Sequence, residues 1–456
     1  MPGGQEVHST DPGQYLEAGW ASGRPTAMRF GVSVAILGIL VATAPLSGTA
    51  AANPEPFPTA QSKKGLQVQM VDDALALGVK HAALNFNVAQ LIDPRGASNS
   101  LEWQHEGRIY RFHRNYVDSL DRQIRPLSDR GVIVSLILLN YASADPEIRR
   151  ILQHPGYNTN CPNQLSAFHT STAEGRDWLT AAMEFLAERW SRPDSRHGRV
   201  WNWIVGNEVN SHWFWSNMGR VGMEEFADDY LRSVRLVHGA VRRFSDHSRV
   251  YVSLEHHWNL RYPGGDDRQA FPGRAFLDYL SAQARAGGDF DWNVAFHPYP
   301  ENLFEPRVWN DRSATADWRT TERITFRNLD QLLAFLGRPE LQFRGRTRRV
   351  ILSEQGFHSP DGPDGELVQA AAYCYAWRKV MSQPGIDSFI LHRHVDHAHE
   401  GGLNLGLWRK VPGSVATPGQ PKRIYDVFLR ADTAESDAAF AFALPVIGIT
   451  QWAELR

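Results

Sequence analysis

The sequence contains little cysteine, no excess of one charge and no hydrophobic run long enough to span a membrane. Cys161 and Cys374 are the only cysteines among 456 residues, which is too few for a disulfide framework or a cysteine-rich zinc site. Cys161 lies in a predicted loop rich in Pro and Asn, whereas Cys374 lies in a predicted helix. We expect two free thiols, with a single disulfide between them as the alternative.

The charge is balanced, because 48 Lys and Arg residues against 50 Asp and Glu residues give a formal net charge of -2. Proteins that bind nucleic acids usually carry a basic surface, and proteins held on membrane surfaces usually carry basic segments. The composition therefore predicts no nucleic-acid partner and no basic membrane-binding patch. We also expect the mature protein to be a monomer.

An apolar run near the N-terminus, Val32 to Ala44, has the features of a secretory signal peptide. Met28-Arg29 places a positive charge before it, and Ala50-Ala51-Ala52 supplies small residues for cleavage. The run is too short for a membrane span, although a short anchored helix is the alternative. We expect a secreted protein, extracellular or periplasmic, whose true start is Met28 and whose signal peptide covers about residues 28–52.

Two catalytic motifs of other enzyme classes are missing. No Gly-rich nucleotide-binding loop follows an early predicted strand, and no Gly-x-Ser-x-Gly elbow of a serine hydrolase is present. Aromatic residues are abundant instead, with 15 Trp, 13 Tyr and 22 Phe. Many of these rings must fill the core, but a surplus of Trp also suits stacking against the apolar faces of sugar rings.

From Gly65 onward, predicted strands and helices alternate. The strands cover residues 79–86, 132–139, 200–205, 249–254, 292–296, 349–353 and 388–391, and an earlier strand is expected near 62–64. The helices cover residues 66–77, 115–130, 172–191, 223–244, 273–285, 325–336, 366–381 and 422–430. Eight such units predict an α/β fold, a (β/α)8 TIM barrel, with a doubly wound open sheet as the alternative. We assign residues 1–52 to an N-terminal extension with its signal peptide and residues 53–456 to one catalytic domain.

Polar and aromatic side chains stand at the ends of these strands. Every carboxyl end in such a barrel faces the same rim, so these side chains are expected to converge. Glu208 follows the fourth strand and Glu354 follows the seventh, and a pair of carboxylates is what cleavage of a glycosidic bond requires. The other residues that we expect to bind substrate are Asn87, Asn140, Asn207, Trp258, His297, Tyr299, His392 and His394.

This layout resembles clan A of the retaining glycoside hydrolases, in which the acid/base Glu follows strand four and the nucleophile Glu ends strand seven. Asn207-Glu208 and Ser353-Glu354-Gln355-Gly356 match these positions, and His297-Pro298-Tyr299 matches a common ending of strand six. Gly206 to Asn210 and Ser353 to Phe357 are similar to a bacterial secreted family described as domain of unknown function 5722.

The resemblance implies a retaining glycosidase that hydrolyses the O-glycosidic bonds of a poly- or oligosaccharide without a metal or a cofactor. Glu354 would attack the anomeric carbon, and Glu208 would protonate the leaving oxygen and then activate water. Asn207 fits a hydrogen bond to the sugar 2-hydroxyl, although turn residues often bond their own backbone. Tyr299 could donate to Glu354, and His297 could orient either carboxylate.

Two departures from clan A leave the contacts with the sugar open. The second strand ends in Asn85 and Asn87, where many clan members carry Arg near the nucleophile. The last strand ends in His392 and His394, where a Trp platform is common. Other tryptophans could replace the platform or simply pack below the rim: Trp213, Trp215 and Trp258.

Two other functions remain as alternatives. His392 and His394 share a face of their strand, so they could bind the metal of a metal-dependent hydrolase. The barrel could also be a carbohydrate-binding protein without turnover. Glu255 could line the cleft as a third carboxylate, whereas Asp72-Asp73 is expected on a solvated helix face.

Overall fold

Eight parallel strands close into a barrel in the computed structural model, which describes residues 51–455. The barrel strands are β1 (Lys64–Gln67), β2 (His81–Asn87), β5 (Ile133–Leu139), β6 (Asn202–Val205), β7 (Arg249–Glu255), β8 (Trp292–His297), β9 (Val350–Leu352) and β10 (Ile386–Leu391). Neighbours in the barrel follow the order of the chain, and β1 closes the ring by pairing with both β2 and β10.

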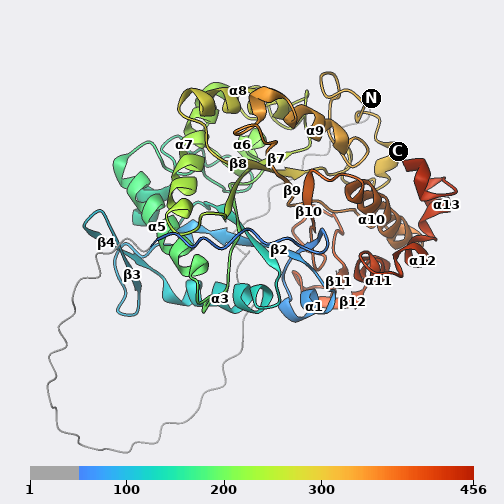
Figure 1. The fold of residues 1–456 in the computed structure, drawn as a ribbon, viewed down its shortest axis with the longest axis horizontal. Helices are drawn as coiled ribbons and strands as arrows, with labels where there is room; N and C mark the ends of the chain where they lie inside the picture. Colours follow the sequence, from blue (N-terminus) through green and yellow to red (C-terminus); the bar gives the residue numbers. More distant parts are fainter. Residues whose placement is uncertain (1–50, 456) are drawn as a thin grey trace, which may run out of the picture. The chain divides into compact units, whose positions relative to one another are not determined.

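Helices connect the strands and surround the barrel (Figure 1). The longer ones are α3 (Arg114–Ser128), α5 (Ala173–Ser191), α7 (Met223–Arg242), α8 (Gly273–Ala286), α9 (Leu329–Leu336), α10 (Gly365–Met381) and α11 (Arg423–Arg430). The shorter ones are α1 (Val71–Ala76), α2 (Val88–Leu91), α4 (Pro146–Leu152), α6 (His212–Trp215), α12 (Ser436–Phe440) and α13 (Ala443–Ile447). The predicted (β/α)8 barrel is therefore confirmed.

Successive side chains along each barrel strand belong alternately to two apolar layers. In β5, Ile137 and Leu139 belong to a cluster inside the barrel, whereas Leu136 and Leu138 belong to the larger layer that packs under the helices. This is the two-residue period of a strand buried on both faces, which explains why the strand sequences are almost continuously apolar. Tyr141 and Trp215 are partly buried and pack against the inner cluster.

Gly65 allows β1 to fit between its two neighbours. A Cβ atom at this position would lie 2.7 Å from a side-chain carbon of Ile390 and 2.9 Å from Cβ of His81. Those separations are too short for van der Waals contact, so a larger residue would push β1 away from β10 or β2. The absence of a side chain at Gly65 therefore helps the ring to close.

The first strand and the first helix differ from the prediction. The helix expected over 66–77 begins only at Val71, and the strand expected near 62–64 runs from Lys64 to Gln67. Leu66 has a spacing that also fits a helix, but pairing with Ala82 on β2 and Leu391 on β10 holds it in the sheet. Two hairpins in loops were also not predicted, β3 (Leu101–His105) with β4 (Arg108–Phe112) and β11 (Trp408–Lys410) with β12 (Pro418–Pro421).

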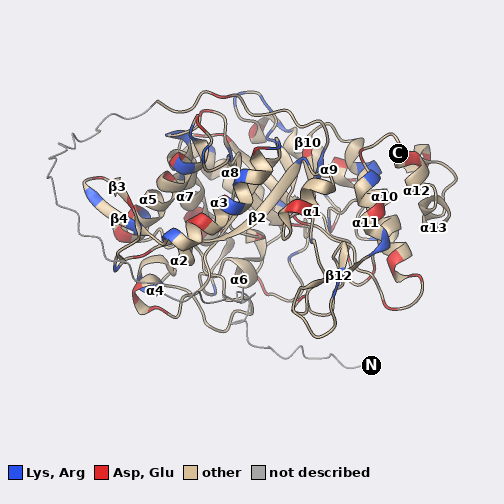
Figure 2. Cartoon of the chain, turned by 90° about the horizontal axis from the view of Figure 1, so that it is seen from below, with Lys and Arg blue, Asp and Glu red and all other residues tan. Residues whose placement is uncertain are grey.

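The predicted signal peptide lies almost wholly outside the described residues. Within residues 51–455, no helix combines the length and the apolar character needed to cross a membrane. Cys161 and Cys374 are both buried free thiols, as expected. In the view of Figure 2, acidic and basic residues are interspersed along the helices.

Candidate active site

Glu208 stands on a sharp turn directly after β6. Gly206 has a φ of 75° and Glu208 itself has a φ of 42°, in the left-handed region that residues other than glycine rarely adopt. The N–H group of Glu208 donates to Oγ of Ser253, at 3.0 Å, which anchors the turn to β7. Backbone conformations of this kind cost free energy and occur often at functional sites, so the position of this carboxylate points to a function.

Glu354 follows β9, and its carboxylate accepts hydrogen bonds from one residue of another strand and from one residue just beyond a third strand. Nε2 of Gln67 donates to one carboxylate oxygen at 3.0 Å, and the hydroxyl of Tyr299 donates to the other at 3.3 Å. Gln67 is the last residue of β1, and Tyr299 lies two residues beyond β8. Residues from two other parts of the ring therefore fix the orientation of this carboxylate.

The two glutamates meet across the rim, with His297 between them. Oxygen atoms of Glu208 and Glu354 and a ring nitrogen of His297 all lie within 4.8 Å of one another. Nδ1 of His297 is 2.9 Å from Oε1 of Glu208, and its Nε2 is 3.0 Å from Oγ of Ser353. The side chain of Glu208 is 12% exposed, so the pair is mostly buried but open to solvent.

The surroundings move the pKa values of the two carboxyl groups in opposite directions. Burial raises the pKa of Glu208, helped by the negative charges of Glu354 and Glu255, and this outweighs the hydrogen bond to His297. Burial also raises the pKa of Glu354, but attraction to His392 and His297 and the hydrogen bond from Gln67 more than offset it, so that pKa falls. The pair therefore favours a protonated Glu208 beside an ionised Glu354.

His297 and Tyr299 reinforce this difference. Burial lowers the pKa of His297, but its hydrogen bond to Glu208 and the charge of Glu354 raise that pKa overall, which favours a cation beside Glu354. Burial and the nearby carboxylates raise the pKa of Tyr299 well above its usual value, so its hydroxyl remains a donor. Both residues lie where the sequence predicted contact with the carboxylates.

Glu255 is a third buried carboxylate beside the pair, but its oxygens are already bonded. They accept hydrogen bonds from Asn210 at 2.7 Å, from Ser211 at 3.0 Å and from the ring of His257 at 2.5 Å. Burial raises the pKa of Glu255, but the charge and hydrogen bond of His257 lower it to about 2. Glu255 therefore supplies a fixed negative charge that helps to keep the proton on Glu208.

The predicted substrate-binding residues separate into two groups. Asn207, next to Glu208, is buried, and its Oδ1 has no hydrogen-bond partner among the described residues. Asn87 caps α2, since its Oδ1 accepts from the N–H group of Ala89 at 3.0 Å. The buried amide of Asn140 donates to two backbone carbonyls, those of Leu152 at the end of α4 and of Ala167. The structure thus gives Asn87 and Asn140 structural roles, because backbone groups hold their amides.

Trp258 is fully buried, and a sugar could not stack on it. Its ring lies 4.8 Å from that of Phe335, and its Nε1 donates to the carbonyl of Trp318 at 2.9 Å. Trp213 is also buried, whereas Trp215 is partly exposed above the inner cluster. Of the three predicted platforms, only Trp215 presents accessible surface.

His392 and His394 point to different partners. Nδ1 of His392 lies 2.6 Å from Oε1 of Gln67, at the edge of the carboxylate pair. His394 is buried and lies 2.8 Å from Asp73, away from His392's partners. The pair therefore does not form the two-histidine metal site that its spacing suggested. Asp73 in turn is not on a solvated face, because His394, Trp408 and Tyr425 all hydrogen-bond to it.

Three residues at or near the site escaped the sequence analysis. Gln67 lies on the strand with the weakest sequence signal, and Ser253 lies inside a strand where a small polar residue is not informative. Glu400 belongs to the loop after β10, and its charge contributes to the pKa of Glu354. The concentration of His, Asp and Glu in the run from His392 to Glu400 is the sequence signal that points to this loop.

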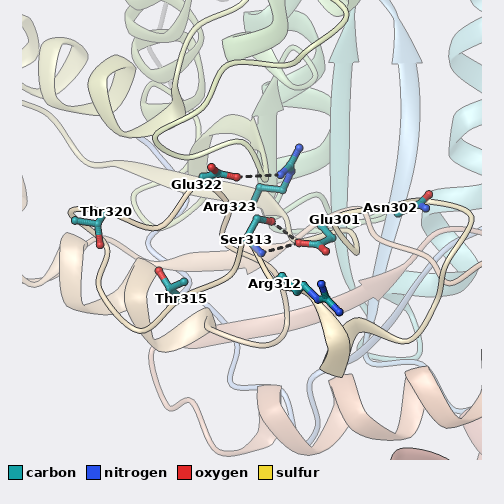
Figure 3. Close-up of a pocket in the computed structure, with 8 residues that line it drawn as sticks. All are labelled: Glu301, Asn302, Arg312, Ser313, Thr315, Thr320, Glu322 and Arg323. Carbon is teal, nitrogen blue, oxygen red and sulfur yellow. Dashed lines mark hydrogen bonds and ion pairs between the residues drawn. The ribbon is translucent and has the colours of Figure 1, made fainter. Parts of the chain in front are cut away.

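A separate cavity of about 600 Å³ lies in the long loop between β8 and α9 (Figure 3). Its lining residues are Glu301, Asn302, Arg312, Ser313, Thr315, Thr320, Glu322 and Arg323. Figure 3 shows Glu301 bonded to Ser313 and Glu322 paired with Arg323, which ties the loop to itself. Neither Glu208 nor Glu354 lines this cavity, so we locate the candidate site at the carboxylate pair.

Comparison with known proteins agrees with this architecture. The profile of a family of unknown function, DUF5722, matches residues 56–455. The chain belongs to this family. A search of curated protein sequences found no match for this DUF5722 member.

Solved structures with a similar fold include glycoside hydrolases. A family 39 glycoside hydrolase from the gut symbiont Bacteroides cellulosilyticus WH2 is 14% identical with a TM-score of 0.51, over 82% of the DUF5722 chain and 64% of that hydrolase. A β-glucosidase from Pyrococcus furiosus is 14% identical with a TM-score of 0.49, over 82% of this chain and 86% of the other. The chain spans less than two thirds of the family 39 protein, and the 14% identity to that protein shows a common fold alone.

Proposed function

We propose that the protein is a retaining glycoside hydrolase in which Glu354 is the nucleophile and Glu208 is the acid/base. The observation that carries this proposal is the approach of the two carboxylates, within 4.8 Å, at the carboxyl ends of β6 and β9. Retaining enzymes hold their carboxyl groups about 5 to 5.5 Å apart, whereas inverting enzymes need about 6.5 to 9.5 Å to admit a water molecule. The separation favours the retaining reaction.

The reaction takes two steps. In the first, an oxygen of Glu354 bonds to the anomeric carbon while the bond to the leaving oxygen breaks, and that oxygen takes the proton of Glu208. In the second, ionised Glu208 takes a proton from water, whose oxygen bonds to the anomeric carbon and releases the carboxylate of Glu354. Glu208 ends protonated and Glu354 ends ionised, so the enzyme returns to its starting state.

The neighbouring residues support these roles. The directions in which the pKa values of Glu208 and Glu354 move match the protonated acid and the ionised nucleophile that the first step needs. Tyr299 donates to Glu354, and His297 contacts Glu208. Asn207 has an amide that can bond a sugar hydroxyl, and Trp215 can stack against a sugar ring. We propose a carbohydrate substrate, and an extracellular or periplasmic one if residues 28–52 direct export.

The proposal is tested with a panel of natural oligosaccharides and aryl glycosides, followed by the Glu354→Ala variant on each cleaved substrate. We expect the variant to lose at least about a thousandfold in kcat, because it lacks the covalent step. Azide should restore turnover and yield a glycosyl azide of inverted configuration, since the anion replaces the missing carboxylate. Glu322→Gln, a change in the separate cavity, is the matched control and should retain activity.

Three outcomes would contradict the proposal. Near wild-type turnover by Glu354→Ala would remove this residue as the nucleophile. Inverted configuration in the wild-type product, followed by NMR, would exclude the covalent intermediate. Saturable glycan binding with no cleavage of any substrate in the panel would favour the alternative, a carbohydrate-binding barrel without turnover.

A further inference from the structure

A chain of hydrogen bonds leads from Glu354 to the loop after β10, and the two chemical steps described above do not use it. Gln67 donates from Nε2 to Oε2 of Glu354 at 3.0 Å, while its Oε1 lies 2.6 Å from Nδ1 of His392. Nε2 of His392 lies 3.5 Å from Oε2 of Glu400, which also pairs with Arg393. Gln67 and His392 are separated by 325 residues in the sequence and meet only because β1 and β10 are neighbours.

The chemistry of these groups fixes the direction of each hydrogen bond. The carboxylate of Glu354 accepts, so the amide nitrogen of Gln67 must face it and the amide oxygen must face His392. That oxygen also accepts, so Nδ1 of His392 must carry a proton. Its other nitrogen faces the carboxylate of Glu400, which is again an acceptor. Both ring nitrogens of His392 therefore face acceptors, and the side chain of Gln67 links this ring to Glu354.

Glu400 is suited to hold the ring of His392 in place. Burial raises the pKa of Glu400, but the charge and hydrogen bond of His392 and the charge of Arg393 bring it to about 2. A carboxylate that stays ionised at any moderate pH keeps attracting His392. Within residues 51–455, no Lys or Arg forms an ion pair with Glu354 itself. Neutral hydrogen bonds and nearby histidines must therefore offset the free-energy cost of burying Glu354 as an ionised carboxylate.

We propose that Gln67 and His392 are positioning residues, which aim the carboxylate of Glu354 and keep it ionised, with Glu400 and Arg393 holding His392. This inference rests on the proposed function for its catalytic consequence, because a nucleophile must be ionised to attack. The orientation and the ionisation of Glu354 are themselves properties of the protein without substrate. Gln67 transmits the effect of His392 to Glu354, because its amide contacts both side chains.

The test replaces Gln67 and measures the charge of Glu354 in two independent ways. Gln67→Met keeps the volume but removes both hydrogen bonds, and Gln67→Glu adds a second carboxylate beside Glu354. We expect the acidic limb of kcat/KM to move upward by about one pH unit in Gln67→Met and further in Gln67→Glu, since like charges disfavour ionisation. At pH values below both acidic limbs, kcat should be about tenfold lower in Gln67→Met than in wild type, with little change in KM.

The second measurement needs no substrate. Carbon-13 NMR of carboxyl-labelled glutamate, with Glu354→Gln to assign the signal, follows the titration of Glu354 directly. We expect its midpoint to rise in Gln67→Met and in His392→Asn. Gln69→Glu makes the same chemical change two residues further on, where the side chain is exposed, and should move neither the midpoint nor the acidic limb.

The outcomes separate this inference from the proposed function. An unchanged Glu354 midpoint in both Gln67→Met and His392→Asn would overturn the positioning role, whatever the activity. A shifted midpoint in a protein that cleaves no glycan would keep the positioning role and remove the glycosidase. If Gln67 merely joined β1 to β10, Gln67→Met would lower the melting temperature and leave the midpoint where it is, which would also overturn the inference.

Discussion

The backbone and the neighbours of Glu208 together set the orientation of its carboxyl group and favour its protonated form. The left-handed conformation turns the side chain back over the barrel, where it meets His297. Burial and the charges of Glu354 and Glu255 then favour its protonated form. Each of these effects opposes the folded state, so their combination at one residue supports a catalytic role rather than a structural one.

These shifts predict a bell-shaped pH dependence of kcat/KM. Activity should fall on the acidic side as Glu354 takes a proton, below the usual carboxyl range because its pKa is lowered. It should fall on the alkaline side as Glu208 loses its proton, at a pH above the usual carboxyl range because the pKa of Glu208 is raised. Rates measured between pH 3 and pH 10 on one aryl glycoside check both limbs.

Glu208→Gln provides the matching variant for the alkaline limb. The amide cannot donate a proton to the leaving oxygen or take one from water, so hydrolysis of unactivated glycosides should fall at least about a hundredfold. Substrates with an acidic leaving group need no protonation and should still form the glycosyl-enzyme. An alkaline limb that persists unchanged in Glu208→Gln would assign that limb to another group.

At the scale of elements, Asp73 joins the first helix to the end of the chain's last barrel unit. It lies on α1 and accepts hydrogen bonds from His394 at 2.8 Å, from Trp408 on β11 at 3.0 Å and from Tyr425 on α11 at 2.8 Å. These contacts span more than 320 residues of sequence and close the ring on its outer side. The pattern of α1 alone suggested a solvated face.

We expect Asp73→Ala to lower the free energy of unfolding by about 2 kcal/mol, because it leaves three donors without their acceptor. Asp72→Ala, at the exposed neighbouring position, is the control and should change stability little. Hydrogen bonds from His394, Tyr425 and Trp408 outweigh burial and lower the pKa of Asp73, so its contribution is present above its ordinary pKa and is lost as the pH falls through the lowered value.

Denaturant unfolding at pH 7 and near pH 3 measures both effects. The difference between wild type and Asp73→Ala should shrink at the lower pH. Equal destabilisation by Asp72→Ala and Asp73→Ala would mean that the network contributes nothing beyond the helix itself.

At the scale of the whole molecule, residues 51–455 contain two groups at the rim whose spacing could suit a metal ion: Glu208, His297 and Glu354, and Glu255, His256 and His257. In both groups the ligand atoms already bond to one another or to the chain. His257 bonds to Glu255, and Nδ1 of His256 lies 2.9 Å from the carbonyl of Tyr299. A metal ion would have to break these hydrogen bonds.

We therefore expect dialysis against EDTA to leave kcat and KM unchanged, with substoichiometric metal by mass spectrometry. Loss of activity on chelation, restored by zinc, would instead favour the metal-dependent hydrolase. Calcium or magnesium that restores only thermal stability would point to a structural ion and would leave the mechanism intact.

The sequence by itself determined the alternation of apolar strands and amphipathic helices, and with it the barrel. It also located Glu208, Glu354, His297 and Tyr299, because each lies within a few residues of a strand end and parallel strands bring such ends to one rim. These patterns involve only residues that are near one another in the sequence, so the sequence alone is enough to predict them.

Only the tertiary structure decided which strand-end residues face the cleft. Asn87, Asn140 and Trp258 are held by capping or packing, and Gln67 reaches Glu354 across 287 residues of sequence. The physical reason is that ring closure brings the first strand beside the last. The partners of a side chain between β1 and β10 depend on the register in which these two strands pair. The hydrophobic pattern of either strand alone does not determine that register.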